Sequence, residues 1–197
     1  MPNWCNNYIE IEGVGVSKIK EILEANPLGS MFELLVGKYA EGQTEEEYQQ
    51  TWYDTNCDRW GCKWDVEIDL DSINFFEDHF MSMNLQTAWS PCNDFLRLLH
   101  QKYSVFVKND YSETGNDFAG TFEIDEDGEV DNCYSYLEGL YHSDYDYFIM
   151  EVQNQIEYLK DDNEDEIPSV DEWLKEFPYA SMDCLVELQE MFILEMS

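Results

Sequence analysis

Apolar and polar residues alternate in several short runs of this sequence, and an alternation of period two predicts β-strands. In residues 63–70, apolar side chains occupy every second position from Trp64 to Leu70, and charged side chains lie between them. This run predicts a half-buried strand with an acidic outer face. Strands are also expected over residues 7–13, 80–89 and 104–111.

Helical patterns separate these strands. Ile19, Ile22 and Leu23 form the apolar face of a helix after the first strand. Ser17 is positioned to cap this helix, and Pro27 is positioned to end it.

Two more helices are predicted from the signals at their N-termini. Thr44 and Glu47 have the spacing of a capping box, so we expect a short helix over about residues 45–53. Pro91 fits the first position of a later helix, whose apolar stripe begins at Phe95.

The Asp127-Gly128 pair lies between the runs 118–124 and 129–136 and predicts a β-hairpin. The order is therefore β-α-insert-β-β-α-β followed by a hairpin, which is the ferredoxin-like split βαβ order. Helical patterns dominate after residue 137, and Ser181 can open the last helix. We expect an α+β fold, with an antiparallel ferredoxin-like domain over residues 1–136. A helical C-terminal extension over residues 137–197 would pack on or beside it.

Four motifs stand out in this frame: MPNWCNN at the start, RWGCKWD at 59–65, TAWSP at 87–91 and GNDFAGTFEI at 115–124. Together they resemble the YubB ferredoxin-like domain family of phages and conjugative plasmids, over roughly residues 1–135. The resemblance implies the same fold and a source in a phage or another mobile element. It implies no activity, because none is established for the family. Cys62 and Cys92 depart from the usual family pattern.

The strongest compositional bias is a net charge of −34, from 44 acidic and 10 basic residues. The acidic residues are not confined to a tail. Residues 131–197 contain 18 acidic and 2 basic residues, and residues 1–130 contain the other 26 and 8. With 44% hydrophobic residues the chain can build a core, so both parts must carry their charge on a folded surface.

This charge is comparable to that of DNA. A compact chain of this length has a radius of gyration of about 16 Å and spans about 42 Å. Duplex DNA of that length carries about 25 phosphate charges. Direct binding to nucleic acid or to an anionic membrane is therefore disfavoured. A basic partner protein is favoured, above all one with a groove for nucleic acid.

The start of the chain has neither the basic nor the apolar segment of a signal peptide. No apolar run approaches the roughly 18 residues of a membrane span. Six cysteines in such a chain are expected to be reduced thiols. We therefore expect a protein of the host cytoplasm that contains no cofactor.

Signals for metal binding or catalysis are weak. Cys57 and Cys62 have four residues between them, unlike the pairs of zinc sites, and no histidine lies nearby. The acidic stretch around Gly128 resembles a calcium loop, but Tyr134 occupies the position of the final glutamate, so a hairpin turn is preferred. No catalytic triad can be assembled from the pattern. We expect no metal and no enzymatic activity.

The most distinctive set combines tryptophans with scarce positive charges near expected strand ends. The candidate ligand pocket consists of Arg59, Trp60, Lys63, Trp64, Asp65 and Trp89. Two interpretations remain open. In the first, the set is a core and strand-edge cluster, with Trp64 inward and with Lys63 and Asp65 each paired across strands. In the second, it is a small pocket for a planar or anionic ligand, with Arg59 or Lys63 supplying the charge.

The main functional hypothesis is a non-enzymatic protein that inhibits a host defence protein. It would occupy the basic nucleic-acid groove of a CRISPR effector or a restriction enzyme, as a DNA mimic. The candidate partner-binding residues are Asp144, Tyr145, Asp146, Asp161, Asp162, Glu164, Asp165, Glu166, Glu67, Asp69 and Asp71. The alternative is a nucleotide-binding module that uses Trp60, Trp64 and Trp89, and self-association into a homodimer is also considered.

Overall fold

The computed structural model describes residues 2–143, 147–152, 175, 177, 179–181, 184–186 and 188. The chain divides into two compact units, Met1–Cys133 and Tyr134–Ser197. Each unit has a hydrophobic core of its own.

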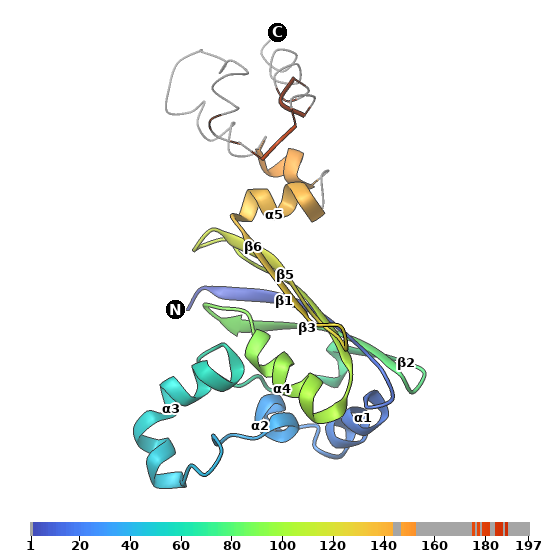
Figure 1. Ribbon diagram of the computed structural model, residues 1–197, viewed down its shortest axis with the longest axis vertical. Helices are drawn as coiled ribbons and strands as arrows, with labels where there is room; N and C mark the ends of the chain where they lie inside the picture. Colours follow the sequence, from blue (N-terminus) through green and yellow to red (C-terminus); the bar gives the residue numbers. More distant parts are fainter. Residues whose placement is uncertain are drawn as a thin grey trace. The chain divides into compact units, whose positions relative to one another are not determined.

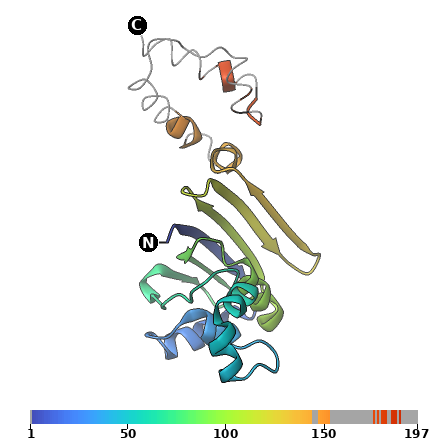
Figure 2. The same ribbon diagram turned by 90° about the vertical axis from the view of Figure 1, so that its left-hand side faces the viewer.

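The first unit is built on a six-stranded antiparallel sheet in the order β2-β3-β1-β4-β5-β6 (Figure 1, Figure 2). The strands are β1 (Trp4–Glu12), β2 (Ile73–Phe76), β3 (Phe80–Ala88), β4 (Phe106–Glu113), β5 (Phe118–Ile124) and β6 (Glu129–Tyr134). In β1, Ile9 pairs with Met83 of β3 on one side and with Asn109 of β4 on the other. Ile9 and Ile11 are buried whereas Tyr8 is exposed, so the sheet has one covered face and one open face.

Helices cover one face of this sheet. In the described part of the unit they are α1 (Val16–Ala25), α2 (Met31–Val36), α3 (Glu45–Trp60) and α4 (Asn93–Tyr103), and the short 3-10 helix η1 spans Leu70–Ser72. In Figure 1, the four helices lie on the same side of the sheet, with α3 on the left, α4 and α2 in the middle and α1 on the right. Their apolar side chains join the buried strand residues in one core, where the rings of Phe32 and Phe95 stack at 4.1 Å. None of the helices in the described part of the chain has the length and apolar character needed to span a membrane.

The strand order confirms the predicted ferredoxin-like arrangement. β1 lies between β3 and β4, and β2 pairs with the other side of β3, as the split βαβ order requires. The hairpin at Asp127-Gly128 is also confirmed, because β5 and β6 are neighbours. The backbone N–H groups of Asp127 and Gly128 donate to the Asp125 carboxylate at 2.8 and 3.0 Å and close this turn. The hairpin extends the sheet beyond β4.

The strand predicted over residues 63–70 does not form. The segment is irregular, and its backbone bonds to the start of α2 instead. The Met31 N–H donates to the Val66 carbonyl at 2.8 Å, and the Ile68 N–H donates to the Gly29 carbonyl at 3.0 Å. The prediction is wrong because alternation of apolar and charged residues indicates only which side of a segment is buried. It does not indicate which part of the chain forms hydrogen bonds with the backbone of that segment. The second strand of the fold is β2.

Asp65 holds the irregular segment against α2. Its carboxylate accepts hydrogen bonds from the backbone N–H groups of Phe32 (2.7 Å), Glu33 (2.8 Å) and Val66 (2.7 Å). It thus caps the N-terminus of α2 from a distant part of the chain. Burial raises the pKa of this carboxyl group, and the three N–H donors act in the opposite direction.

Two helix starts differ from their predictions. Gly15, not Ser17, is the N-cap of α1, and the Ser17 hydroxyl donates to the Val14 carbonyl at 3.1 Å. Pro91 precedes the first turn of α4, whose N-cap is Cys92. Neither N-cap makes a side-chain capping bond. A capping bond contributes only about 1 kcal/mol, so packing against the sheet outweighs this local signal.

A group of buried polar side chains joins the middle of the sheet to α4. The Asn7 amide of β1 donates to Thr87 Oγ1 of β3 at 2.9 Å, and its oxygen accepts from the Asn109 amide of β4 at 3.0 Å. Asn109 also donates to Asn93 Oδ1 at the start of α4, at 3.1 Å. All four side chains are buried. Their directional bonds therefore fix which parts of three strands and one helix come together.

The described residues of the second unit form a smaller aromatic core. The helix α5 (Tyr136–Ser143) contributes Tyr141, and the helical residues 147–152 contribute Phe148. Their rings meet at 5.4 Å. The Cys184 N–H donates to Ser181 Oγ at 3.2 Å, which agrees with the predicted helix start at Ser181.

We expect Asn7→Ala to lower the free energy of unfolding by about 2–4 kcal/mol, because it removes several hydrogen bonds of buried polar groups at once. Asn6→Ala, at an exposed position of the same strand, is the matched control and should have a much smaller effect. Urea unfolding followed by circular dichroism measures both. Equal losses in the two variants would contradict the role given to Asn7.

Candidate functional site

The end of α3 meets the start of α4 at a glycine. Gly61 follows α3 in the left-handed conformation (φ +79°), and a Cβ atom there would lie 2.8 Å from the Pro91 carbonyl oxygen. The Ser90 hydroxyl donates to the Gly61 carbonyl at 2.6 Å. Only glycine suits both the left-handed conformation and the close approach, so this contact fixes the position from which the chain continues into residues 62–65.

The helix before this glycine is longer than its capping signal predicts. The capping box of Thr44 and Glu47 is confirmed, but α3 continues past residue 53 to Trp60. Trp52 and Tyr53 therefore lie in the middle of a helix. After the helix ends, the side chain of Lys63 reaches back to them, and its Nζ lies 5.9 Å from the centroid of each ring.

Trp89 follows β3 in a backbone conformation that large side chains rarely adopt, with a φ of +67°. Its N–H donates to the Asn3 carbonyl at 2.9 Å. The Thr87 hydroxyl donates to the Ser90 carbonyl at 2.6 Å across the same turn. Bonds on both sides thus hold the strained residue and orient its indole ring.

Four aromatic rings surround the ammonium group of Lys63, and we call this arrangement the Lys63 cluster. The distances from Nζ to the ring centroids are 4.6 Å for Trp64, 5.0 Å for Trp89, and 5.9 Å for both Trp52 and Tyr53. The four side chains are 36–49% exposed, so the cluster lies at the surface. It can hold a cation between ring faces and can offer its outer ring surfaces to a planar group.

The structure separates the other predicted pocket residues from this cluster. Arg59 is directed to the end of α2, where its Nη2 donates to the Val36 carbonyl at 2.9 Å. Trp60 is buried in the core, with its ring 5.7 Å from that of Phe32. Asp65 is occupied by the N-terminus of α2. Of the predicted set, Lys63, Trp64 and Trp89 are the ones brought together.

The first interpretation of the set, a core and strand-edge cluster, does not describe Trp64. Its ring is exposed, and residues 63–65 belong to no strand. The Asp65 carboxylate accepts hydrogen bonds from backbone N–H groups and makes no pair across strands. The strand predicted over residues 63–70 fails to form for the same physical reason: this segment bonds to α2 and not to a neighbouring strand.

Trp52, Tyr53 and Trp4 were not predicted as neighbours of this set. The ring of Trp4 lies 6.5 Å from that of Trp64 and extends the line of aromatic side chains onto β1. The signal that points to Trp52 and Tyr53 is Gly61, because a glycine is the commonest residue just after a helix. It extends the predicted helix well beyond residue 53.

The predicted partner-binding residues fall into two sets. Glu67, Asp69 and Asp71 are exposed on the irregular segment and η1. Asp69 accepts the N–H of Asp71 at 3.1 Å, and the backbone of Glu67 bridges to Ser30. The other set lies outside the described residues: Asp144, Tyr145, Asp146, Asp161, Asp162, Glu164, Asp165 and Glu166.

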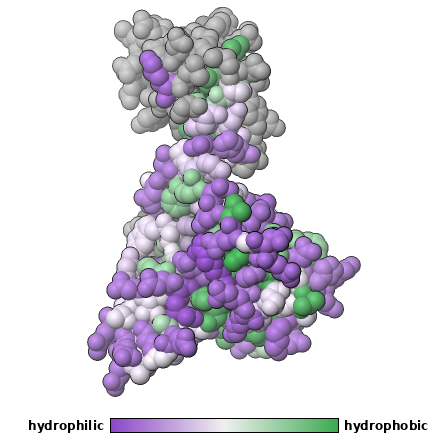
Figure 3. Space-filling view, in the orientation of Figure 1, coloured by the Kyte–Doolittle hydropathy of each residue, from purple (hydrophilic) through white to green (hydrophobic). Residues whose placement is uncertain are grey.

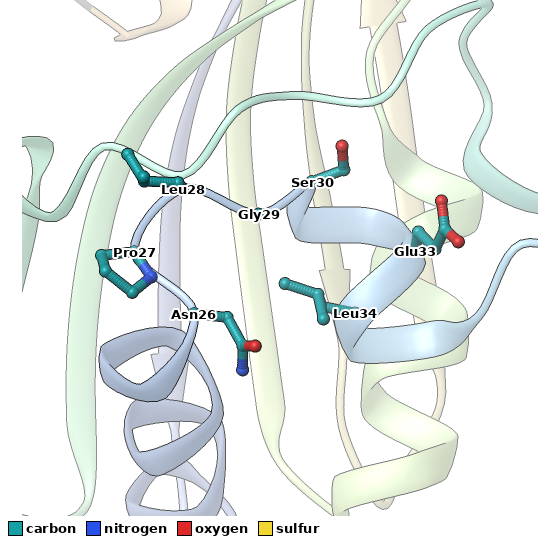
Figure 4. A pocket seen from close by; sticks show the side chains of 7 residues that line it. All are labelled: Asn26, Pro27, Leu28, Gly29, Ser30, Glu33 and Leu34. Atoms are coloured by element: carbon teal, nitrogen blue, oxygen red, sulfur yellow. The ribbon is translucent and has the colours of Figure 1, made fainter.

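One hollow of about 430 Å³ lies where the loop after α1 leads into α2 (Figure 4). Pro27, Leu28 and Leu34 give it apolar walls, and Glu33 is the charged residue among those that line it. A single carboxylate beside aliphatic groups offers little specific chemistry, so this hollow is not the favoured site.

A groove of about 660 Å³, which we call the edge groove, lies between the irregular segment and strands β1 and β3. Asp65, Glu67 and Asp69 contribute carboxylates, and Trp4 and Gln86 line the side formed by the strands. Neither lysine nor arginine is among the residues that line it. The groove therefore suits a cationic or hydrogen-bonding group and not an anion.

Three cysteines near the aromatic side chains are buried thiols. Burial raises the pKa of Cys5 and of Cys62 to about 12, and that of Cys92 well above its usual value. They are protonated at neutral pH, which makes them poor nucleophiles and poor metal ligands. In the part of the chain that the structure describes, no group of three His, Cys, Asp or Glu residues could hold a metal ion.

Comparison with protein families agrees with this fold. Residues 59–154 match the family model of the ferredoxin-like domain in Api92-like protein. The matched region supports a ferredoxin-like family and includes Lys63, Trp64, Trp89 and strands β2 to β6. The comparisons with curated proteins and with solved structures each found no match.

We expect Lys63→Met to lower the free energy of unfolding by about 1 kcal/mol, because the rings lose the charge that they attract while the chain length is kept. Lys18→Met removes the same charge from an exposed ion pair with Glu21 and should leave stability almost unchanged. Urea unfolding followed by tryptophan fluorescence compares the two variants. An equal change in both would mean that net charge, and not the cluster, is responsible.

Proposed function

We propose that this protein is a non-enzymatic, acidic binding protein whose surface replaces nucleic acid in the basic groove of a partner protein. The distribution of charge is the observation that most supports the proposal. Residues 1–143 contain 28 acidic and 8 basic residues. On the face shown in Figure 3, hydrophilic residues cover most of the described part of the chain.

The basic residues of this part are engaged within the protein itself. Arg97 binds carboxylates, with Glu129 and Asp94 each at 2.6 Å. Lys102 donates to the Leu35 carbonyl at 2.6 Å. Lys18 pairs with Glu21, and Lys108 pairs with Asp110. Arg59 donates to the Val36 carbonyl. The other three lysines lie over aromatic rings: Lys20, Lys38 and Lys63. Five of the eight thus contact neutral groups, which leaves a surplus of carboxylates for a partner.

A surface of this kind suits a basic groove for two physical reasons. Long-range attraction between opposite charges speeds the encounter of the two proteins. Once water is excluded, carboxylates form short, charge-assisted hydrogen bonds with arginine. Exposed tryptophans beside the carboxylates, such as Trp4 and Trp64, can anchor the interface.

We infer the kind of partner from the source that the sequence suggests. The four motifs that resemble the YubB family support a phage or another mobile element. The proteins that such elements must resist are host defence nucleases, which hold nucleic acid in basic grooves. A CRISPR effector or a restriction enzyme in the host cytoplasm is therefore the proposed target.

The test is capture of partners by the purified protein from a nuclease-treated bacterial lysate, with elution by salt and identification by mass. We expect a nucleic-acid-binding protein to be retained at low salt and released by about 1 M salt, where charges are screened beyond about 3 Å. The purified complex should then dissociate when the partner's own DNA or RNA is added. Retention in 1 M salt, or simultaneous binding of the nucleic acid, would contradict charge mimicry.

Two neutralised variants show which carboxylates make the contact. One changes Glu67, Asp69 and Asp71 to their amides, and the other changes Asp161, Asp162, Glu164, Asp165 and Glu166. We expect at least one variant to release the partner at lower salt than the parent protein. Unchanged release from both variants would remove these residues from the proposed interface.

The Lys63 cluster supports a second candidate function, the binding of a nucleotide. Trp64 and Trp89 offer partly exposed rings for a base, and the Lys63 ammonium group lies between them as a charge for phosphate. We expect at least one compound in a panel of nucleotides to raise the melting temperature of the protein. We expect Trp64→Ala to abolish this shift while the circular dichroism spectrum stays unchanged. If no nucleotide shifts the melting temperature, this candidate is removed.

A further inference from the structure

The edge groove exists because the chain before β2 is held away from β3. The Met31 N–H bonds to the Val66 carbonyl, and the Phe32 N–H bonds to the Asp65 carboxylate. These bonds direct the segment toward α2, and β2 begins only at Ile73. A space is therefore left beside the second half of β3.

One edge of β3 lies open in this space. β2 pairs with the first four residues of β3, and among the described residues no strand pairs with 84–88 on that side. Asn84, Leu85 and Gln86 all line the groove, although neighbouring side chains of a strand point to opposite faces. The groove therefore runs along the strand edge, where the described residues provide no strand partner for the backbone of residues 84–88.

The wall opposite this edge is acidic. Glu67 and Asp69 are exposed there, and Asp65 also lines the groove, with its oxygens bound to backbone N–H groups. On the side of the groove formed by the strands, the side-chain amide of Gln86 donates a hydrogen bond to the side-chain oxygen of Asn6 at 2.9 Å. Trp4 supplies an aromatic surface that continues toward Trp64. Backbone hydrogen-bonding groups thus face carboxylates across one groove.

We propose that the edge groove binds an extended basic segment of the partner protein, which adds as a strand to residues 84–88 of β3. Main-chain hydrogen bonds to β3 would supply affinity, and pairing of arginine or lysine with Glu67 and Asp69 would supply specificity. Five residues of strand span about 17 Å, so the bound segment is about five or six residues long. This inference rests on the proposed function and names the part of the partner that is recognised.

Two other occupants fit the groove less well. Nucleic acid would bring phosphates against Glu67 and Asp69. A second copy of this chain would bring acidic strands, such as β6 with Glu129 and Asp131, and like charges would oppose the pairing. A basic segment meets neither obstacle.

The test uses the full-length protein and a capped octapeptide in which arginine and valine alternate. Two further peptides carry N-methyl groups on the odd-numbered or on the even-numbered residues. In an added strand, only alternate residues direct their N–H groups toward β3, so methylation of the odd-numbered or of the even-numbered residues blocks these bonds, but not both. We expect one methylated peptide to bind about tenfold more weakly than the parent peptide and the other to bind almost as well as the parent. Calorimetry measures the affinities, and amide shifts of residues 84–88 in NMR spectra locate the peptide.

A matched pair of protein variants tests the acidic wall. Glu67→Gln with Asp69→Asn removes two charges from the groove, and Glu24→Gln with Asp78→Asn removes two from exposed positions outside it. We expect the groove variant to weaken peptide binding about tenfold and the control variant to weaken it far less. NMR spectra of the free variants verify that both remain folded.

Three outcomes would overturn the proposal: no binding of the parent peptide, equal binding of both methylated peptides, or equal effects of the two protein variants. None of them bears on charge mimicry, which is tested separately by salt elution and by competition with nucleic acid. If instead capture and competition fail while the peptide binds as expected, the groove recognises basic strands but the protein does not replace nucleic acid.

Discussion

The placement of the candidate site depends on the hydrogen bonds of the buried Asn7 side chain. Asn7 bonds to the Thr87 hydroxyl, Thr87 bonds to the Ser90 carbonyl, and the Ser90 hydroxyl bonds to the Gly61 carbonyl. This series links the central strand to the turn that contains Trp89 and to the end of α3. Buried polar groups are costly to leave unpaired, so they select one arrangement where apolar packing alone would accept several.

A second constraint is the scarcity of positive charge. A net charge of −34 opposes a compact state through self-repulsion. Arg59 and Lys102 bind the carbonyls of Val36 and Leu35 in the last turn of α2, where the helix end is electronegative. The ammonium group of Lys63 lies among the aromatic rings of the Lys63 cluster. Because these cations stabilise the fold from within, an approaching partner meets a surface dominated by carboxylates.

Much of the fold could be predicted from the sequence, because β1, β3, β4 and the hairpin have local patterns that agree with their final pairing. The strand at residues 63–70 could not be excluded in this way, since its outcome depends on Asp65 capping α2 from a distant position. The site was predicted in part. Lys63 and Trp64 are adjacent in sequence, but Trp52 joins them only because α3 continues to Gly61. Distant contacts of this kind leave no local periodicity.

The wrongly predicted strand and the edge groove have one physical cause. When residues 65–68 bond to α2, β3 loses a neighbour and keeps an open edge. Open edges are a hazard, because they pair with other chains, and proteins protect them with charge. Here Glu67 and Asp69 provide that charge, and in so acidic a protein they repel a second copy. The same carboxylates attract a basic strand, so a single device both limits self-association and favours one class of partner.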